Sequence, residues 1–304
     1  MWLIFAFMSA SMLGFYDVFK KLSLRDNAVI PVLFLNTLFC SLFFVPVIMA
    51  SGSVIGTDSF LFIPDTSLYE QQFILLKALI VLSSWVMGYI AIKHLPLTIV
   101  GPINATRPVM VLLGALLIYH EQLNPWQWAG VTLSIISFFM FSRSGRKEGI
   151  RFSHNRWIFY LIIAAILGAA SGLYDKLILT PESQGGLGLN RMCVQAYYNF
   201  YQCGMMFVAL MTMWWPRRKT TAPFKWHYAI PLISVFLSLA DLVYFYALSQ
   251  PDAMLSVVSM IRRGSVVVSF CVGGVLLREK NLRSKFFDVI LVLLSMVLLY
   301  IGSK

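Results

Sequence analysis

The stretch that decides the fold is residues 6–17, AFMSASMLGFYD, because the chain contains a second version of it, AAILGAASGLYD, at residues 164–175. Both copies place small residues four apart and end in Tyr-Asp. Residues four apart lie on one face of a helix, so each copy predicts a helix with a stripe of small residues that lets another helix approach closely. The chain is therefore predicted to be two half-length copies of one unit.

The composition indicates a membrane protein. Hydrophobic residues make up 59% of the chain and charged residues 12%, whereas soluble domains have about 45–50% and about 25%. Apolar runs of about 20 residues, each long enough to cross a bilayer as a helix, recur along the sequence. We predict an all-α integral membrane fold with ten transmembrane spans, at residues 2–22, 29–50, 73–93, 97–119, 125–142, 157–179, 191–214, 226–248, 252–277 and 283–302.

The net charge of +11 is explained by its distribution. Basic residues gather after the odd-numbered spans: Lys20, Lys21, Arg25, Arg143, Arg146, Lys147, Arg151, Arg156, Arg217, Arg218, Lys219, Lys225, Arg278, Lys280, Arg283 and Lys285. The positive-inside rule then places the odd connections in the cytoplasm and both termini outside it. This distribution indicates topology and not a nucleic-acid partner, and the short termini favour a bacterial plasma membrane.

The two copies are expected to have opposite orientations in the membrane. A shift of 158 residues also carries Glu121 onto Glu279, and a shift of 155 carries Tyr89 onto Tyr244 and Arg107 onto Arg262. Each unit has five spans, an odd number, so the second unit must enter the membrane inverted. We expect repeats at residues 1–142 and 157–304, joined by a basic loop at 143–156. Inverted repeats with polar residues at mid-depth are typical of secondary transporters.

Arg107 and Arg262 are the strongest candidate site residues. Arg107 lies ten residues into its predicted span, about 15 Å deep at the helical rise. A guanidinium that faces lipid there costs on the order of 3 kcal/mol, so each arginine must face a partner or a wet cavity. One alternative is an internal ion pair with Asp17, Asp175 or Asp241 that only holds helices together.

Further polar and aromatic residues at mid-depth complete the predicted site. Asp17 and Asp241 are the candidates for carrying a coupling proton, because burial favours a protonated carboxyl group. For Asn36 and Asn199 a hydrogen bond between helices is an alternative to substrate contact. The residues predicted to bind substrate alongside the two arginines are Tyr16, Asn36, Trp85, Tyr89, Asn104, Tyr174, Asn199, Tyr244 and Tyr246.

Other chemistries have no support in the sequence. The four cysteines and four histidines show no metal or redox spacing. No P-loop, dinucleotide fingerprint or nucleic-acid motif occurs. We therefore expect no cofactor, no metal, no nucleic-acid partner and no enzymatic activity.

Two ordered stretches resemble the EamA-like transporters of the drug/metabolite transporter superfamily. The first runs from Leu95-Pro96 through Pro108 to Glu121 and on to Gly130, and the second from Ala247 through Glu279 to Leu291. The resemblance covers essentially the whole chain. It implies ten helices in two inverted five-helix repeats around a central cavity, and transport of amino acids, other metabolites or drugs without ATP hydrolysis.

The leading hypothesis is a secondary-active transporter for a small polar or anionic metabolite, in which the arginines bind a carboxylate or phosphate. A proton-coupled exporter of cationic drugs and a non-transporting membrane scaffold are the alternatives. The expected partners are a small molecule, the lipid bilayer and, in a coupled mechanism, a proton. A homodimer is left open.

Overall fold

The computed structural model describes residues 2–59, 61–119, 124–146, 155–179, 182–248, 261–262, 264–277 and 282–302. This part of the chain is helical and contains no strand, only an isolated bridge between Ser51 and Ile55. The helices are α1 (Trp2–Leu24), α2 (Val29–Ala50), α3 (Leu68–His94), α4 (Leu97–Ala105), α5 (Arg107–Tyr119), α6 (Pro125–Arg146), α7 (Arg156–Leu179), α8 (Arg191–Ala209), α9 (Ala229–Leu248), α11 (Ser265–Leu276) and α12 (Leu282–Gly302). A short 3₁₀ helix, η2 (Glu182–Gln184), precedes α8, and a π-helical turn, η3 (Leu210–Trp214), follows it.

The helices occupy the ten predicted spans, with α4 and α5 sharing the fourth span and α11 lying in the ninth. Four helices are long and apolar enough to cross a membrane: Leu3–Leu24, Val29–Ala50, Leu68–His94 and Arg156–Leu179. Three further helices are apolar but shorter: Ala229–Tyr244, Ser265–Leu276 and Phe286–Gly302. Large apolar side chains such as Phe7, Phe139 and Phe159 are exposed. A helical protein with such an outer surface is typical of a multi-pass membrane protein. The predicted glutamate pair Glu121 and Glu279, most of the 143–156 loop and residues 252–260 lie outside the described residues.

Several predicted boundaries need correction. The third helix starts at Leu68 and not at residue 73, because Ser67 and Glu70 form a capping box at its N-terminus. The fourth span is not one continuous helix: it is broken at Thr106, which separates α4 from α5. Pro108 explains the break, because it has no N–H to bond to the Asn104 carbonyl one helical turn earlier.

The ends of three other helices also differ from the prediction. The predicted span 191–214 divides into α8 and the π-helical turn η3. The eighth helix begins at Ala229, three residues later than predicted, and α6 continues to Arg146 rather than ending at residue 142. Differences of this size arise because an apolar run does not mark where the last hydrogen-bonded turn of a helix lies.

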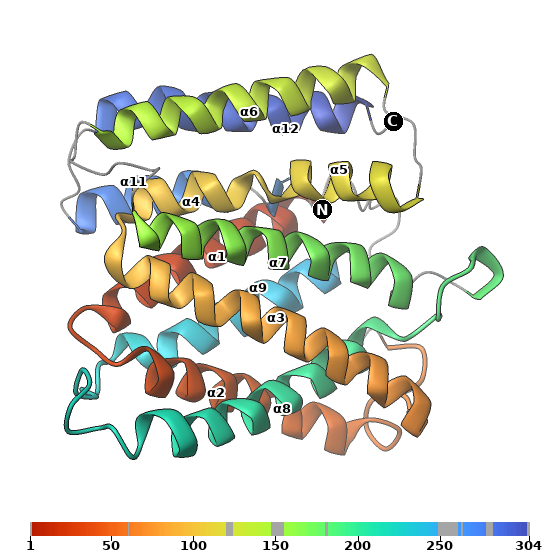
Figure 1. Ribbon diagram of the computed structural model, residues 1–304. Coiled ribbons are helices and arrows are strands. Elements are labelled where there is room, and N and C mark those ends of the chain that lie inside the picture. Colours follow the sequence, from red (N-terminus) through yellow and green to blue (C-terminus); the bar gives the residue numbers. More distant parts are fainter. Residues whose placement is uncertain are drawn as a thin grey trace.

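The helices pack in a regular scheme. The main neighbours of α1 are α9 and α11, and those of α7 are α3 and α5. The other large contacts join α2 to α8 and α6 to α12. Figure 1 shows the α6/α12 pair at one edge of the molecule and the α2/α8 pair at the other, with the remaining helices between them. Most residues of the predicted site lie on the helices between these edges, whereas Asn36 lies on α2 and Asn199 on α8.

Glycines of the two small-residue stripes lie where α1 and α7 closely approach neighbouring helices, as the repeated stretch predicts. A Cβ atom added at Gly14 of α1 would lie 2.5 Å from Val268 Cβ of α11. A Cβ atom added at Gly172 of α7 would lie 3.3 Å from Val111 Cγ2 of α5. Buried serines join α1 to α9 and α3 to α7, since Ser9 donates to the Ala240 carbonyl at 2.7 Å and Ser84 to the Ala164 carbonyl at 2.7 Å.

Candidate functional site

Two clusters of charged and polar residues lie inside the described bundle, in addition to the buried Asp288 of α12. The first, which we call the Asp17 cluster, contains Tyr16, Asp17, Lys20, Tyr89 and Arg107. The second, the Asp241 cluster, contains Lys77, Asp175, Gln195, Tyr198, Asp241, Tyr244 and Arg262. The Asp17 cluster brings together α1, α3 and α5, and the Asp241 cluster draws on α3, α7, α8 and α9.

The Asp17 cluster is arranged around a buried ammonium group. Lys20 is 6% exposed, and its Nζ donates to Asp17 Oδ1 at 2.7 Å, one helical turn earlier in α1. The same Nζ lies 4.1 Å from the ring centroid of Tyr16 and 5.4 Å from that of Tyr89. Both tyrosines are buried, and the Tyr89 hydroxyl has no hydrogen-bond partner in the described protein. Cation–π contacts and one carboxylate therefore hold this lysine inside the bundle.

Arg107 is the second cation of this cluster. The break at Thr106 makes Arg107 the first residue of α5, and its guanidinium lies against the bare backbone of Gly168 in α7. The guanidinium interacts electrostatically with Asp17 and Tyr16. Its Nε is buried without a hydrogen-bond partner, and no ion pair of the described residues includes it. The Asp17 cluster thus holds two cations and one carboxylate.

The positive and negative charges of the Asp241 cluster are equal in number. Lys77 of α3 pairs with Asp175 of α7, and Arg262 pairs with Asp241 of α9. Gln195 Nε2 donates to Asp241 Oδ2 at 3.0 Å and to the Tyr198 hydroxyl at 3.3 Å, which connects α8 to α9. Two cations therefore face two carboxylates.

Aromatic rings complete the Asp241 cluster. The Arg262 guanidinium stacks on Tyr244, with its Cζ 4.4 Å from the ring centroid, and Lys77 Nζ lies 5.8 Å from the ring of Tyr198. Every cation of this cluster thus has a carboxylate and an aromatic partner. The alternative of an internal ion pair, raised for both arginines, applies to Arg262, whereas Arg107 has no such pair among the described residues.

Other predicted residues lie apart from these clusters. Asn36 Oδ1 accepts from Ser234 at 3.0 Å, and Asn199 Nδ2 donates to the Gln195 carbonyl at 2.7 Å, so both amides contribute hydrogen bonds within or between helices. The Tyr174 hydroxyl donates to the Phe73 carbonyl at 3.2 Å. Trp85 packs on the main hydrophobic core, and Tyr246 is 40% exposed and stacks edge-on against Phe5.

Some buried polar atoms have no hydrogen-bond partner among the residues that the structure describes. These include Asn36 Nδ2, Asn104 Oδ1, Arg107 Nε, the Tyr89 hydroxyl and both amide atoms of Gln202. Buried polar side chains usually have a hydrogen-bond partner, so a group of exceptions calls for an explanation such as contact with water or with a bound solute. Four of the predicted site residues, Asn36, Tyr89, Asn104 and Arg107, are among them.

Sequence reasoning missed four members of the clusters: Lys20, Lys77, Gln195 and Tyr198. It assigned Lys20 to the basic connection after the first span, although Asp17 and Lys20 are spaced at i and i+3, the separation at which helical side chains meet. No such spacing in the sequence points to Lys77, because its partner Asp175 lies 98 residues away. Only the packing of α3 on α7 brings these two charges together.

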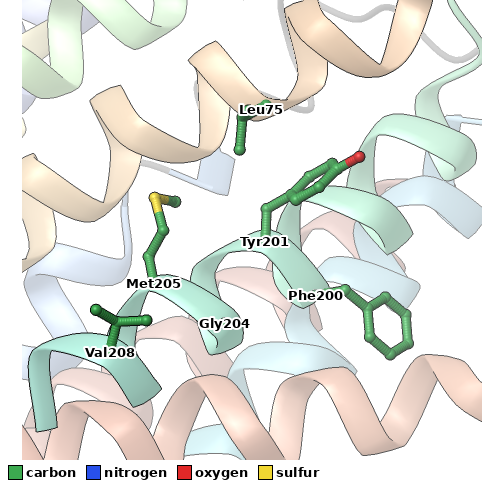
Figure 2. A pocket seen from close by; sticks show the side chains of 6 residues that line it. All are labelled: Leu75, Phe200, Tyr201, Gly204, Met205 and Val208. Atoms are coloured by element: carbon green, nitrogen blue, oxygen red, sulfur yellow. The ribbon is translucent and has the colours of Figure 1, made fainter. Parts of the chain in front are cut away.

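A surface pocket of about 410 Å³ lies between α3 and α8. Figure 2 shows Leu75 reaching from α3 toward Tyr201 and Met205 of α8, with Phe200, Gly204 and Val208 also lining the pocket. The pocket contains none of the predicted site residues, and its lining is mainly apolar. It is therefore distinct from both charged clusters. Within the described chain, no three His, Cys, Asp or Glu side chains are placed to hold a metal ion.

Comparison with known proteins supports the resemblance found in the sequence. The EamA-like transporter family matches residues 1–143 of the chain. No curated protein matches this chain. A solved structure described as "Crystal structure of protein" is similar at a TM-score of 0.58 and 11% sequence identity, over 97% of this chain and 99% of the other. At that identity the similarity shows the fold alone.

Proposed function

We propose that this chain, which matches the EamA-like transporter family over residues 1–143, is a secondary-active transporter for a small polar or anionic metabolite. It moves its substrate by alternating access through a central cavity between two repeats. The observation that carries the proposal is Arg107, a partly buried residue whose Nε is buried without a hydrogen-bond partner and which has no paired carboxylate among the described residues. In a helical bundle surrounded by lipid such a charge is costly, and residues of this kind commonly mark substrate pathways.

The packing scheme supports the two inverted repeats at residues 1–142 and 157–304. A shift of 158 residues carries the start of α1 onto α7, and a shift of 155 carries the end of α3 onto α9. Under this exchange the contacts of α1 with α9 and α11 become those of α7 with α3 and α5. The α2/α8 and α6/α12 pairs each join equivalent helices of the two halves. This is the pairing expected when two halves are related by a pseudo-two-fold axis.

The charge balance favours an anionic substrate. The Asp17 cluster has two cations for one carboxylate, whereas the Asp241 cluster is neutral. A carboxylate or phosphate would accept charge-assisted hydrogen bonds from Arg107 and so provide a partner for its Nε. A cationic drug would add a second excess charge to the same cluster. In this mechanism Asp17 is the candidate proton carrier, because it is the carboxylate closest to the proposed substrate position.

The positive-inside orientation remains part of the proposal, with termini outside the cytoplasm and the plasma membrane as the compartment. Lys20 and Lys21 contribute little to it, because Lys20 is buried and Lys21 donates to the Ile92 and Leu95 carbonyls at the end of α3. The exposed cations after α8, Arg217, Arg218 and Lys219, carry more of the argument.

The test compares metabolites inside and outside cells that produce the wild type, Arg107→Ala or Arg262→Ala, with membrane expression matched by blot. We expect the gradient of at least one small anion to change with the wild type and to revert in Arg107→Ala. Arg262→Ala reports on the paired arginine at the equivalent position of the second half. A response confined to cationic compounds, or no response at all, contradicts the proposed substrate class.

A further inference from the structure

Lys20 is the most deeply buried cation of the described chain that the proposed function does not yet use. It is 6% exposed, on the same helix face as Tyr16 and one turn beyond it in α1. Its ammonium is bounded by the Asp17 carboxylate at 2.7 Å and by the faces of Tyr16 and Tyr89. An ammonium ion has three donor hydrogens, and the hydrogen-bonding neighbours of Lys20 are the Asp17 carboxylate and the Tyr16 side chain. This cation therefore has donor capacity left inside the bundle.

Arg107 has unused donors in the same cluster. Asp17 acts on both cations, since Lys20 donates a hydrogen bond to it and Arg107 interacts with it electrostatically. Asp17 can neutralise one of the two cations. One positive charge remains in a cluster whose Tyr89 hydroxyl and Arg107 Nε have no hydrogen-bond partner among the described residues.

We propose that Lys20 is the second substrate-binding cation of this site, and that Lys20 and Arg107 together bind the carboxylate group of a monocarboxylate. This inference rests on the proposed function and specifies its substrate class. Asp17 holds Lys20 when no anion is bound and competes with the substrate for its ammonium. The rings of Tyr16 and Tyr89 form the apolar walls beside the carboxylate.

The excess of one positive charge favours a singly charged anion such as a monocarboxylate over doubly charged and neutral solutes. A phosphate monoester carries about 1.5 to 2 negative charges near pH 7, and a dicarboxylate carries two, so either would leave the cluster negative. A zwitterionic amino acid has no net charge and would leave the excess uncompensated. Only a singly charged anion balances Lys20, Arg107 and Asp17 together.

The experiment measures anion binding by the purified full-length protein in detergent, as the rise in its thermal unfolding temperature. The panel is benzoate, hexanoate and pyruvate, each with its neutral primary amide, together with succinate, inorganic phosphate and glycine at equal ionic strength. Binding curves for Lys20→Met and Asp17→Asn give the change in dissociation constant. Lys77→Met serves as the matched control, because Lys77 is also a lysine inside the bundle that pairs with a carboxylate.

We expect at least one monocarboxylate to stabilise the wild type while its amide does not. Lys20→Met weakens that binding about tenfold or more, because a charge-assisted hydrogen bond is lost. Asp17→Asn tightens it, because the competing carboxylate is gone, and Lys77→Met leaves it unchanged. If Lys20→Met fails to fold, the direction of the Asp17→Asn change decides the question.

Equal affinity in Lys20→Met and wild type overturns the inference, as does stronger binding of succinate, phosphate or glycine than of any monocarboxylate. A wild type that binds no member of the panel also overturns it. Binding that depends on Lys20 in a protein that moves no metabolite in cells would instead refute the proposed transport while the monocarboxylate site stands. The two failures are therefore distinguishable.

Discussion

Replacing Gly168 by alanine tests the position of Arg107 without touching the arginine. A Cβ atom at residue 168 would lie 2.8 Å from Arg107 Cζ, 2.9 Å from Nη1 and 3.0 Å from Nε. Ordinary van der Waals contact begins at 3.4 Å, so the guanidinium must move by at least about 0.6 Å. A shift of about 1 Å in a positioning group can cost about 100-fold in rate, and we expect Gly168→Ala to lower transport about tenfold or more.

The same substitution has little effect on folding in this account. The atoms that must move are the end of a flexible side chain, and alanine is favoured over glycine in a helix by about 0.5–1 kcal/mol. The unfolding temperature of Gly168→Ala should therefore equal or slightly exceed that of the wild type. Gly88→Ala is the matched control, because its new Cβ atom would face α7 from α3 at an ordinary 3.7 Å from Ala164 Cβ.

The assay is the initial rate of transport per folded protein in cells, for the metabolite whose gradient depends on Arg107, with unfolding temperatures measured on the same variants. Loss of transport in Gly168→Ala alone supports the assignment of Arg107. Wild-type transport by Gly168→Ala, or an equal loss in Gly88→Ala, refutes the reasoning.

Three further predictions concern stability, each measured by unfolding of the purified protein. Gly14→Ala lowers the free energy of unfolding by about 1–3 kcal/mol, because its Cβ atom would lie 2.5 Å from Val268 Cβ on a helix that cannot easily move; an unchanged stability contradicts this close approach. Asp241→Ala costs about 3 kcal/mol by leaving Arg262 unpaired, and adding Arg262→Leu recovers part of the loss; a double variant as unstable as the single one argues against the pair. Ser67→Ala removes the cap of α3 for about 1 kcal/mol and speeds hydrogen exchange in its first turn, and unchanged exchange would show that the cap contributes little.

The sequence predicts the helices well, because an apolar run of membrane-spanning length leaves few alternatives to a helix. The span at residues 29–50 agrees at both ends with α2. The prediction did less well where a local interaction decides the outcome. Pro108 indicated the break at Thr106, but the pattern of apolar residues continues through it, so hydropathy alone joined α4 and α5 into one helix.

The candidate site was predictable in part. Burial depth pointed to Arg107 and Arg262, but depth alone could not tell that one arginine pairs with Asp241 and the other does not. That difference depends on which helices face each other. Lys20 lies near a helix end, where its position in the sequence predicts a solvated charge. It is buried because α3 places Tyr89 beside it.

The central claim is that the protein carries a small anion through the bundle by a route that needs Arg107. Its most direct test is uptake of the metabolite that responds in cells into liposomes that contain the purified wild type or Arg107→Ala, with protein-free liposomes as the blank. The account predicts uptake by the wild type without ATP and a rate near the blank for Arg107→Ala. Uptake that is equal in the two proteins, or equal to the blank in both, would contradict it.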